Sequence, residues 1–255
     1  MITTYHRPQT LDEALKILSK PNTVPLGGGT LLSHRQSDSV EVVDLQSLGL
    51  NSIRKSGNNL EIGATATLQE LFENVNCPEV LKSALKLEAP LNIRNTATVA
   101  GTIVTCDGRS TFVTTLLALD SKLTVLDSKS NTTNLGDYLP LRPRGLITAI
   151  TIPSNTKFVF DYVSRTPADK PIVCVALTQW PSSRTRLAVG GYGKAPRLAM
   201  DGTESEGVDA STSSAQVAAR NAFHEAKDEW ASAEYRMDVA ATLAKRCLIQ
   251  LTRQK

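Results

Sequence analysis

The sequence predicts an α+β protein with two domains that meet near residue 153. Its 255 residues allow one large or two modest domains, at roughly 150 residues per domain. Helix and strand patterns are mixed as far as residue 153, whereas three successive strand patterns and then two helix patterns follow it. This change predicts a first domain of two α+β subdomains (1–153). The second domain (154–255) is predicted to combine a three-stranded antiparallel sheet with C-terminal helices.

The composition excludes several classes of protein. Hydrophobic residues make up 41% and charged residues 21%, as in an ordinary globular chain. A net charge of +3, without runs of basic residues, does not indicate a nucleic-acid-binding surface. No apolar run reaches the roughly 20 residues of a membrane span, and the first residues lack the apolar segment of a signal peptide, so we expect a cytoplasmic protein. The four cysteines lie far apart and predict isolated core residues rather than a metal site.

The first part of the chain opens with a helix and two strands. Residues 10–13 form a capping box, and the apolar residues that follow at helical spacing predict a helix ending near Pro21. A short strand at 24–26 runs into the glycines 27–29, and another strand is expected at 40–44.

The rest of the first domain alternates between the two patterns. We expect a strand at 60–64, a helix after the capping box 67–70, a helix at 80–87 and extended structure at 98–104. A buried helix at 112–119, a hairpin joining 123–126 to 132–133, and a strand at 146–153 complete it.

The second domain is predicted to begin with strands at 158–163, 172–178 and 185–190. Residues 201–213 are rich in Ser, Thr, Gly and acidic residues and predict a solvated loop. Ser213 is expected to cap a first helix, and apolar residues repeating every four positions from Tyr235 predict a second.

Two segments have a composition suited to binding a ligand. Residues 27–30, Gly-Gly-Gly-Thr, directly follow a strand, and successive N–H groups of such a turn can bind an anion. Residues 94–102 combine hydroxyls with small residues that permit close backbone approach. Taken alone, each segment is better explained structurally, as a tight turn and as a Thr-rich strand. Together, in a chain without a nucleophile elbow, a P-loop or a Rossmann glycine pattern, they favour a phosphate-bearing cofactor.

The motifs also occur in a familiar order. Residues 26–32, Leu-Gly-Gly-Gly-Thr-Leu-Leu, are similar to an Ala-Gly-Gly-Thr-x-Leu motif. Residues 93–95, Ile-Arg-Asn, and 98–101, Thr-Val-Ala-Gly, are similar to Ile-Arg-Asn followed by Thr-Ile-Gly-Gly-Asn. With 60–64 and 146–153, this series resembles the FAD-binding (medium) subunit of the molybdenum hydroxylases, a family that includes carbon monoxide dehydrogenase and xanthine dehydrogenase.

The resemblance implies a two-part FAD-binding domain of the molybdopterin dehydrogenase type, followed by the smaller domain. It implies FAD as cofactor and neither catalytic nor metal-binding residues in this chain. Electrons would arrive from a [2Fe–2S] small subunit and a molybdopterin-binding large subunit, and would leave to NAD, oxygen or a quinone. The cofactor-binding residues that it implies are Leu26, Gly27, Gly28, Gly29, Thr30, Leu31, Leu32, Thr98, Val99, Ala100, Gly101, Thr102, Thr111, Leu146 and Tyr162.

Three departures from the family pattern leave alternatives open. Ala100 stands at the first glycine of the usual pair, Thr102 at the usual asparagine, and Thr111 at the usual aspartate. An electron-transfer flavoprotein subunit is the first hypothesis. A flavin-free structural or assembly subunit of the same kind of complex is the second, and a free-standing flavoenzyme, for which no general base is evident, is the third.

Overall fold

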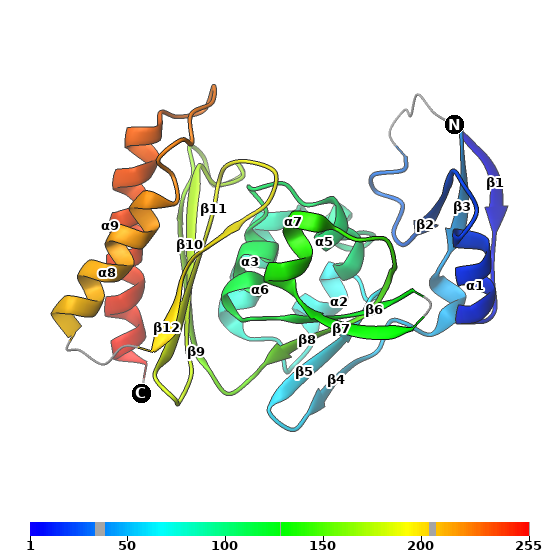
Figure 1. The fold of residues 1–255 in the computed structure, drawn as a ribbon, viewed down its shortest axis with the longest axis horizontal. Coiled ribbons are helices and arrows are strands. Elements are labelled where there is room, and N and C mark those ends of the chain that lie inside the picture. Colours follow the sequence, from blue (N-terminus) through cyan, green and yellow to red (C-terminus); the bar gives the residue numbers. More distant parts are fainter. Residues whose placement is uncertain (34–38, 128, 204–207, 255) are drawn as a thin grey trace.

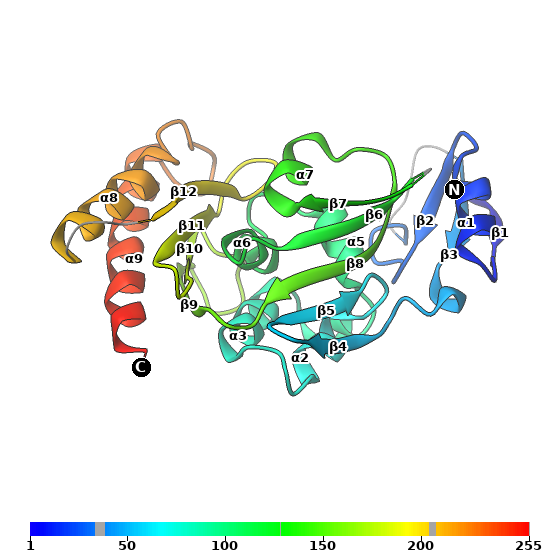
Figure 2. The same ribbon diagram turned by 60° about the horizontal axis from the view of Figure 1, so that its bottom comes forward.

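The computed structural model describes residues 1–33, 39–127, 129–203 and 208–254. Three sheets follow one another along the longest axis of the molecule (Figure 1). The sheet nearest the N-terminus lies at one end, a five-stranded sheet with its helices lies in the middle, and a four-stranded sheet covered by two long helices lies at the other end (Figures 1 and 2). The α+β class predicted from the sequence is confirmed.

The N-terminal sheet is parallel, in the order β1-β3-β2, and carries helix α1. Thr10 caps this helix by accepting a hydrogen bond from the Glu13 N–H, as the capping box predicts. A small separate core joins Ala14 and Val43 to Leu146 of the middle sheet. The elements are β1 (Ile2–His6), α1 (Leu11–Leu18), β2 (Thr23–Leu26), β3 (Val40–Asp44) and the short 3₁₀ helix η1 (Gln46–Leu48).

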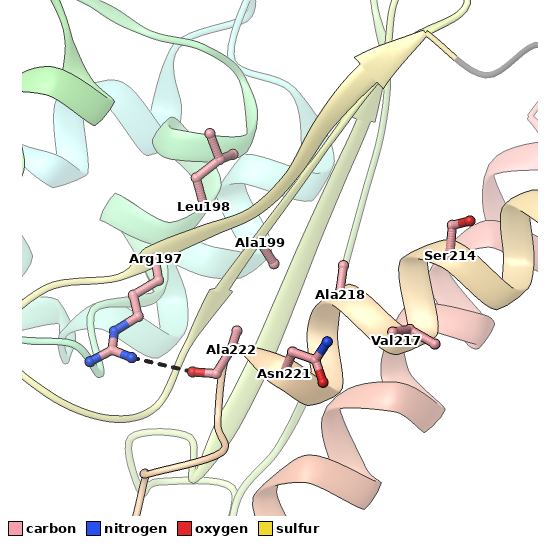
Figure 3. A pocket seen from close by; sticks show the side chains of 8 residues that line it. All are labelled: Arg197, Leu198, Ala199, Ser214, Val217, Ala218, Asn221 and Ala222. Atoms are coloured by element: carbon pink, nitrogen blue, oxygen red, sulfur yellow. Dashed lines mark hydrogen bonds between the residues drawn. The ribbon is translucent and has the colours of Figure 1, made fainter.

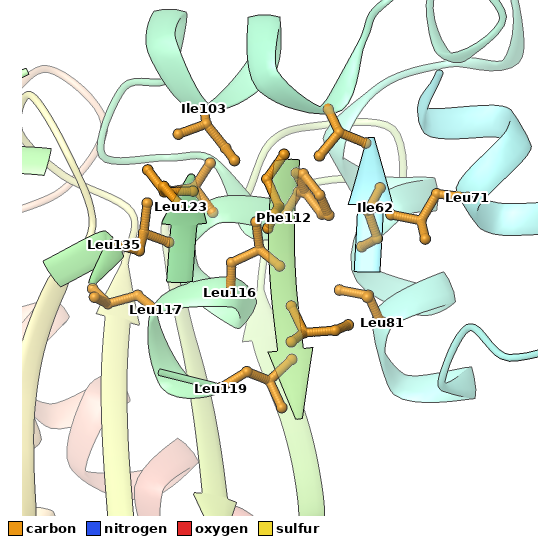
Figure 4. Packing of buried hydrophobic residues seen from close by; sticks show 14 of the residues in the cluster. Ile62, Leu71, Leu81, Ile103, Phe112, Leu116, Leu117, Leu119, Leu123 and Leu135 are labelled. Atoms are coloured by element: carbon orange, nitrogen blue, oxygen red, sulfur yellow. The ribbon is translucent and has the colours of Figure 1, made fainter. Parts of the chain in front are cut away.

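The middle sheet is antiparallel, in the order β4-β5-β8-β6-β7. Its main core is built around the fully buried helix α6, with Phe112 and Leu116 at its centre (Figure 4). The elements are β4 (Ile53–Ser56), β5 (Asn59–Gly63), α2 (Leu68–Glu73), α3 (Glu79–Glu88), α4 (Leu91–Arg94), α5 (Val99–Thr105), α6 (Thr111–Ala118), β6 (Lys122–Leu126), β7 (Ser130–Asn134), α7 (Leu135–Leu141) and β8 (Leu146–Pro153).

The C-terminal sheet has four antiparallel strands, in the order β12-β11-β10-β9, where the sequence predicted three. The fourth, β12, runs into residues that were predicted as loop, and α8 begins before the predicted cap at Ser213. Five of the seven residues of β12 are exposed, so its apolar alternation is weak. The elements are β9 (Lys157–Val163), β10 (Val173–Gln179), β11 (Arg184–Gly190), β12 (Arg197–Thr203), α8 (Val208–Asn221) and α9 (Ala233–Arg253).

One prediction for the first domain is wrong. Residues 98–104 were expected to be extended, but Val99–Thr105 form helix α5. The β-branched residues of this segment favour a strand by propensity, yet the Thr98 side chain caps the helix and the Thr98 backbone makes only an isolated bridge to Thr67. Capping and tertiary contacts therefore decide the conformation.

A seam of backbone contacts joins the middle and C-terminal sheets. The Gly108 N–H donates to the Gly193 carbonyl at 2.8 Å, and the Gly191 N–H donates to the Gly108 carbonyl at 2.6 Å. The Arg142 guanidinium donates to the carbonyls of Cys106 and Lys194, at 2.7 and 3.0 Å. The loop at 106–110 thus lies between the two halves of the chain.

No helix in the described part of the chain is both long and apolar enough to cross a membrane.

The four cysteines are buried and none forms a disulfide. Burial raises the pKa of the Cys77 and Cys174 thiols to about 12 and that of Cys106 to about 11. Because the thiolate is the reactive form, we expect no thiol of the folded chain to react with Ellman's reagent at pH 8 on a timescale of minutes. The same chain in guanidinium chloride is expected to release four equivalents. One rapidly reacting thiol in the folded protein would contradict this account.

Candidate functional site

The two ligand-binding segments predicted from the sequence lie directly against each other. A Cβ atom added to Gly28 would lie 1.6 Å from the Thr96 carbonyl oxygen, and one added to Gly27 would lie 2.6 Å from Thr98 Oγ1. The glycine turn that follows β2 therefore packs with its main chain on the segment leading into α5. Only residues without a side chain allow this approach.

The second segment is held rigidly by hydrogen bonds within the protein. Thr98 caps α5, since its Oγ1 accepts from the Gly101 N–H at 3.2 Å. The Val99 and Ala100 N–H groups donate to the carbonyls of Ala66 and Ala64, at 2.9 and 3.1 Å. The first N–H groups of α5 are therefore already used. This segment supplies a fixed platform rather than free backbone donors.

The glycine turn is different, because its donors are free. Within the described residues, the N–H groups of Gly27, Gly28, Gly29 and Thr30 donate no hydrogen bond. Gly29 has a φ of +70°, a left-handed conformation that favours glycine. The turn is half-buried. It needs no charged side chain to attract an anion, because successive N–H dipoles do so. The Thr30 hydroxyl is available beside them.

Arg94 anchors the platform from below. Its guanidinium donates to Gln69 Oε1 and to the Ala89 carbonyl, both at 2.9 Å, and lies over the Phe72 ring. Only 9% of this residue is exposed. Arg94 therefore fixes the segment that leads into α5, through hydrogen bonds and packing on an aromatic ring.

The other predicted site residues are spread over several environments. Leu26 and Leu32 are half-buried beside the turn, and Leu31 is exposed. Val99 and Leu146 are buried in two different cores. Ala100, Gly101 and Thr102 lie in α5, where Ala100 packs against the main core and the Thr102 hydroxyl donates to the Thr98 carbonyl. The methyl group that Ala100 has in place of the usual glycine therefore packs against the main core.

Neither Thr111 nor Tyr162 makes a hydrogen bond or ring contact with the glycine turn in the described structure. Thr111 is fully buried, and its hydroxyl donates to the Ala84 carbonyl at 2.7 Å. The carboxylate beside it comes from Glu88 of α3, which accepts from Ser110 Oγ at 2.8 Å and from the Phe112 N–H at 3.0 Å. Tyr162 is on β9, 36% exposed, with its ring stacked on Phe160. Their roles in cofactor binding stay predictions.

Sequence reasoning missed the residues that fix the platform from behind. Ala64 and Ala66 contribute carbonyl oxygens, and Thr67 bridges to Thr98 while it caps α2. Any residue has a backbone carbonyl, so the amino-acid sequence does not show which carbonyls will accept these hydrogen bonds. The capping box at Thr67 was visible, but nothing in it indicated a contact with the second segment.

Comparison with known proteins identifies the family. Residues 1–155 match a family model described as the FAD-binding domain in molybdopterin dehydrogenases. The chain belongs to this family. The glyceraldehyde dehydrogenase medium chain of Sulfolobus acidocaldarius is 28% identical over 225 residues, and the uncharacterized protein YgfM of Escherichia coli (strain K12) is 28% identical over 204 residues. Each of these matches covers 78% of this chain and 78% of the relative.

Solved structures share the fold over the whole chain. A CO dehydrogenase chain from Oligotropha carboxidovorans superposes with a TM-score of 0.86 at 22% identity, covering 99% of this chain and 98% of that one. A chain of quinoline 2-oxidoreductase from Pseudomonas putida 86 gives 0.80 at 19% identity, covering 98% and 96%. The molybdenum hydroxylase resemblance stated from the motifs is thereby confirmed, as is its fold.

FAD is the cofactor of this family, and the glycine turn fits its diphosphate. The fit rests on four neighbouring N–H groups without a partner among the described residues, in a turn whose glycines let the main chain pack directly on Thr96 and Thr98. A diphosphate carries the negative charge and the acceptor oxygens that such a turn binds. This chain is therefore an FAD-binding subunit of an oxidoreductase family.

Proposed function

We propose that this chain is the electron-transfer flavoprotein subunit of a molybdenum-dependent hydroxylase or dehydrogenase. The observation that carries the proposal is the glycine turn, with free N–H groups, packed on the α5 platform. FAD, when bound, would supply the redox chemistry, accepting electrons and passing them on. The protein's own part is to bind and orient this group, and the described site offers no residue with an evident role as a general base.

Each part of the site has a separate task in this proposal. The N–H groups of Gly27, Gly28 and Gly29 would hold the diphosphate, and the Thr30 hydroxyl would donate to the same group. Thr98 would keep α5 and the turn in register, because its side chain contacts both. Tyr162, on the C-terminal sheet, would contribute from the second of the two proposed domains, 1–153 and 154–255.

The proposed partners are a [2Fe–2S] small subunit and a molybdopterin-binding large subunit, with NAD, oxygen or a quinone as electron acceptor. The name of the Sulfolobus relative, a medium chain, supports a complex of several chains. We also propose a cytoplasmic location. Four unpaired thiols in the structure are consistent with a reducing compartment.

The first test is the visible spectrum of the purified chain, with released cofactor identified by chromatography and FAD added back where it has been lost. We expect about one FAD per chain, in line with one glycine turn. Replacement of Thr30 by alanine should weaken FAD binding by roughly 2- to 10-fold, the effect of one hydrogen bond. Thr242→Ala, an exposed threonine on α9, is the matched control and should leave affinity unchanged. Affinity is measured by fluorescence titration.

The electron-transfer role needs a second readout. The tagged chain, expressed in its native host, should co-purify with chains that contain iron and molybdenum, and its reduced flavin should be reoxidised by one of the three acceptors. A folded chain that neither contains nor takes up FAD, yet still co-purifies with iron and molybdenum, would overturn the electron-transfer role and support the assembly subunit. FAD uptake without any metal-containing partner would support a free-standing flavoenzyme.

A further inference from the structure

A second cavity lies between the two halves of the chain, and it contains no residue of the glycine turn or the α5 platform. Its volume is about 980 Å³. One wall is formed by the ends of α6 and α7, including Asn134 and Asp137. The other wall is formed by β11, β12 and the loop at 192–196 that connects them. Small-molecule sites of roughly 300–1,000 Å³ occur preferentially at such junctions.

The loop wall offers free backbone donors. Within the described residues, the N–H groups of Gly193, Lys194 and Ala195 donate no hydrogen bond, and Gly193 has a φ of +85°. The carbonyls of the same loop are held from outside, since the Gly193 carbonyl accepts from Gly108 and the Lys194 carbonyl accepts from Arg142. The loop is therefore fixed in a conformation in which successive donors remain available. Such a turn binds anions.

The cations of this cavity fall into two groups. Arg184 and Arg186 are neutralised, because both contact Asp120 and Asp201, with the shortest N–O distances 2.9, 2.8, 3.1 and 2.6 Å. The side chains of Lys194 and Arg197 have no carboxylate partner among the described residues and are exposed. Two positive charges without an ion-pair partner therefore lie beside the three free N–H groups.

Arg197 also borders a neighbouring cavity of about 780 Å³ between β12 and α8 (Figure 3). There its Nη1 donates to the Ala222 carbonyl at 3.4 Å, which occupies one of the five donors of the guanidinium. Ala199, Ala218 and Ala222 line that neighbouring cavity. It offers a ligand no second cation, so the anion site lies on the other side of β12.

We propose that the interdomain cavity binds a small phosphorylated molecule that also carries hydroxyl groups, such as a nucleotide or a sugar phosphate. The phosphate would accept hydrogen bonds from the N–H groups of 193–195 and pair with Lys194 and Arg197. Asp137, on the facing wall, has only a long 3.5 Å contact from Asn134 Nδ2 and would accept from the hydroxyls. Because the two walls belong to different halves of the chain, the ligand would strengthen the seam between them.

Isothermal titration calorimetry of the full chain, saturated with FAD to fill the glycine turn, tests the proposal. The probes are inorganic phosphate, AMP and glucose 6-phosphate, and the last two distinguish the two sources of the phosphate group. We expect saturable binding of at least one organic phosphate. The double variant Lys194→Ala/Arg197→Ala should bind it at least tenfold more weakly. The control Lys245→Ala/Arg253→Ala, which removes two exposed charges from α9, should bind it unchanged.

A further variant separates the phosphate from the hydroxyl contacts. Asp137→Ala should weaken binding of the organic phosphate but leave inorganic phosphate unaffected or slightly tighter, because it removes a negative charge. All variants replace exposed or half-exposed side chains, so retained FAD and melting temperature verify their folding. The proposal is overturned if none of the three probes binds saturably. It is also overturned if the Lys194/Arg197 variant binds as tightly as the unaltered chain.

Discussion

Replacement of Gly28 by alanine is expected to abolish detectable FAD binding at micromolar cofactor. The new Cβ would lie 1.6 Å from the Thr96 carbonyl oxygen and 2.5 Å from its carbon, both of which are main-chain atoms. Main chain cannot move aside as a flexible side chain does, so the glycine turn must separate from the α5 platform. Loss of two of the proposed charge-assisted hydrogen bonds to the diphosphate would cost about 3 kcal/mol, which corresponds to about a hundredfold in affinity.

The effect on FAD should exceed the effect on the fold. The strain of one extra methyl group in a packed place is typically about 1–3 kcal/mol, so the variant should remain folded with a lower melting temperature. Gly202→Ala is the matched control, because nothing lies within 4 Å of a Cβ added there. Fluorescence titration with FAD, alongside circular dichroism, gives both quantities. An affinity for FAD within threefold of the unaltered chain would show that the turn does not hold the diphosphate.

The two candidate segments could be found in the sequence because glycine and threonine cluster in both of them. The run 27–29 after a strand indicated a turn with free donors, and the structure places those donors as expected. The second segment was predicted to be extended, but the structure shows a helix there, and its part in the site stays a prediction. Its Val and Thr residues favour strands, and the decisive contacts, to the carbonyls of Ala64 and Ala66, come from residues whose side chains give no signal.

In the C-terminal sheet, too, elements were predicted where their own residues carry the pattern and missed where contacts with distant residues decide. Strands β9, β10 and β11 were predicted because their apolar residues repeat over buried positions. Strand β12 was not, because most of its residues are exposed and its pairing with β11 shifts register between Leu187 and Ala188. The glycines of Gly-Gly-Tyr-Gly-Lys at 190–194 gave no indication that they contact Gly108. A contact between distant glycines needs the assembled fold.

Because of the contact between Gly108 and the glycines at 191 and 193, we expect Gly108→Ala to lower stability more than the other glycine substitutions. A Cβ added to Gly108 would lie 1.9 Å from the Tyr192 carbonyl oxygen and 2.8 Å from that of Gly193. Gly108→Ala must therefore break its two hydrogen bonds to Gly191 and Gly193. Two hydrogen bonds at about 1 kcal/mol each and overpacking of about 1–3 kcal/mol add to about 3–5 kcal/mol. At roughly 2–4 °C per kcal/mol, the melting temperature should fall by about 10 °C.

Differential scanning calorimetry measures this fall, and Gly136→Ala supplies the control. A Cβ at Gly136 meets its nearest neighbour, Leu117 Cδ1, at an ordinary 3.5 Å and lies in helix α7, so the melting temperature should not fall. Arg142→Ala, which removes the hydrogen bonds to the Cys106 and Lys194 carbonyls, tests the mechanism independently. If Gly108 and Arg142 stabilise one seam, the double variant should lose less stability than the sum of the two single losses. Strict additivity would mean that they act separately, and an unchanged melting temperature for Gly108→Ala would mean that the seam contributes little to stability.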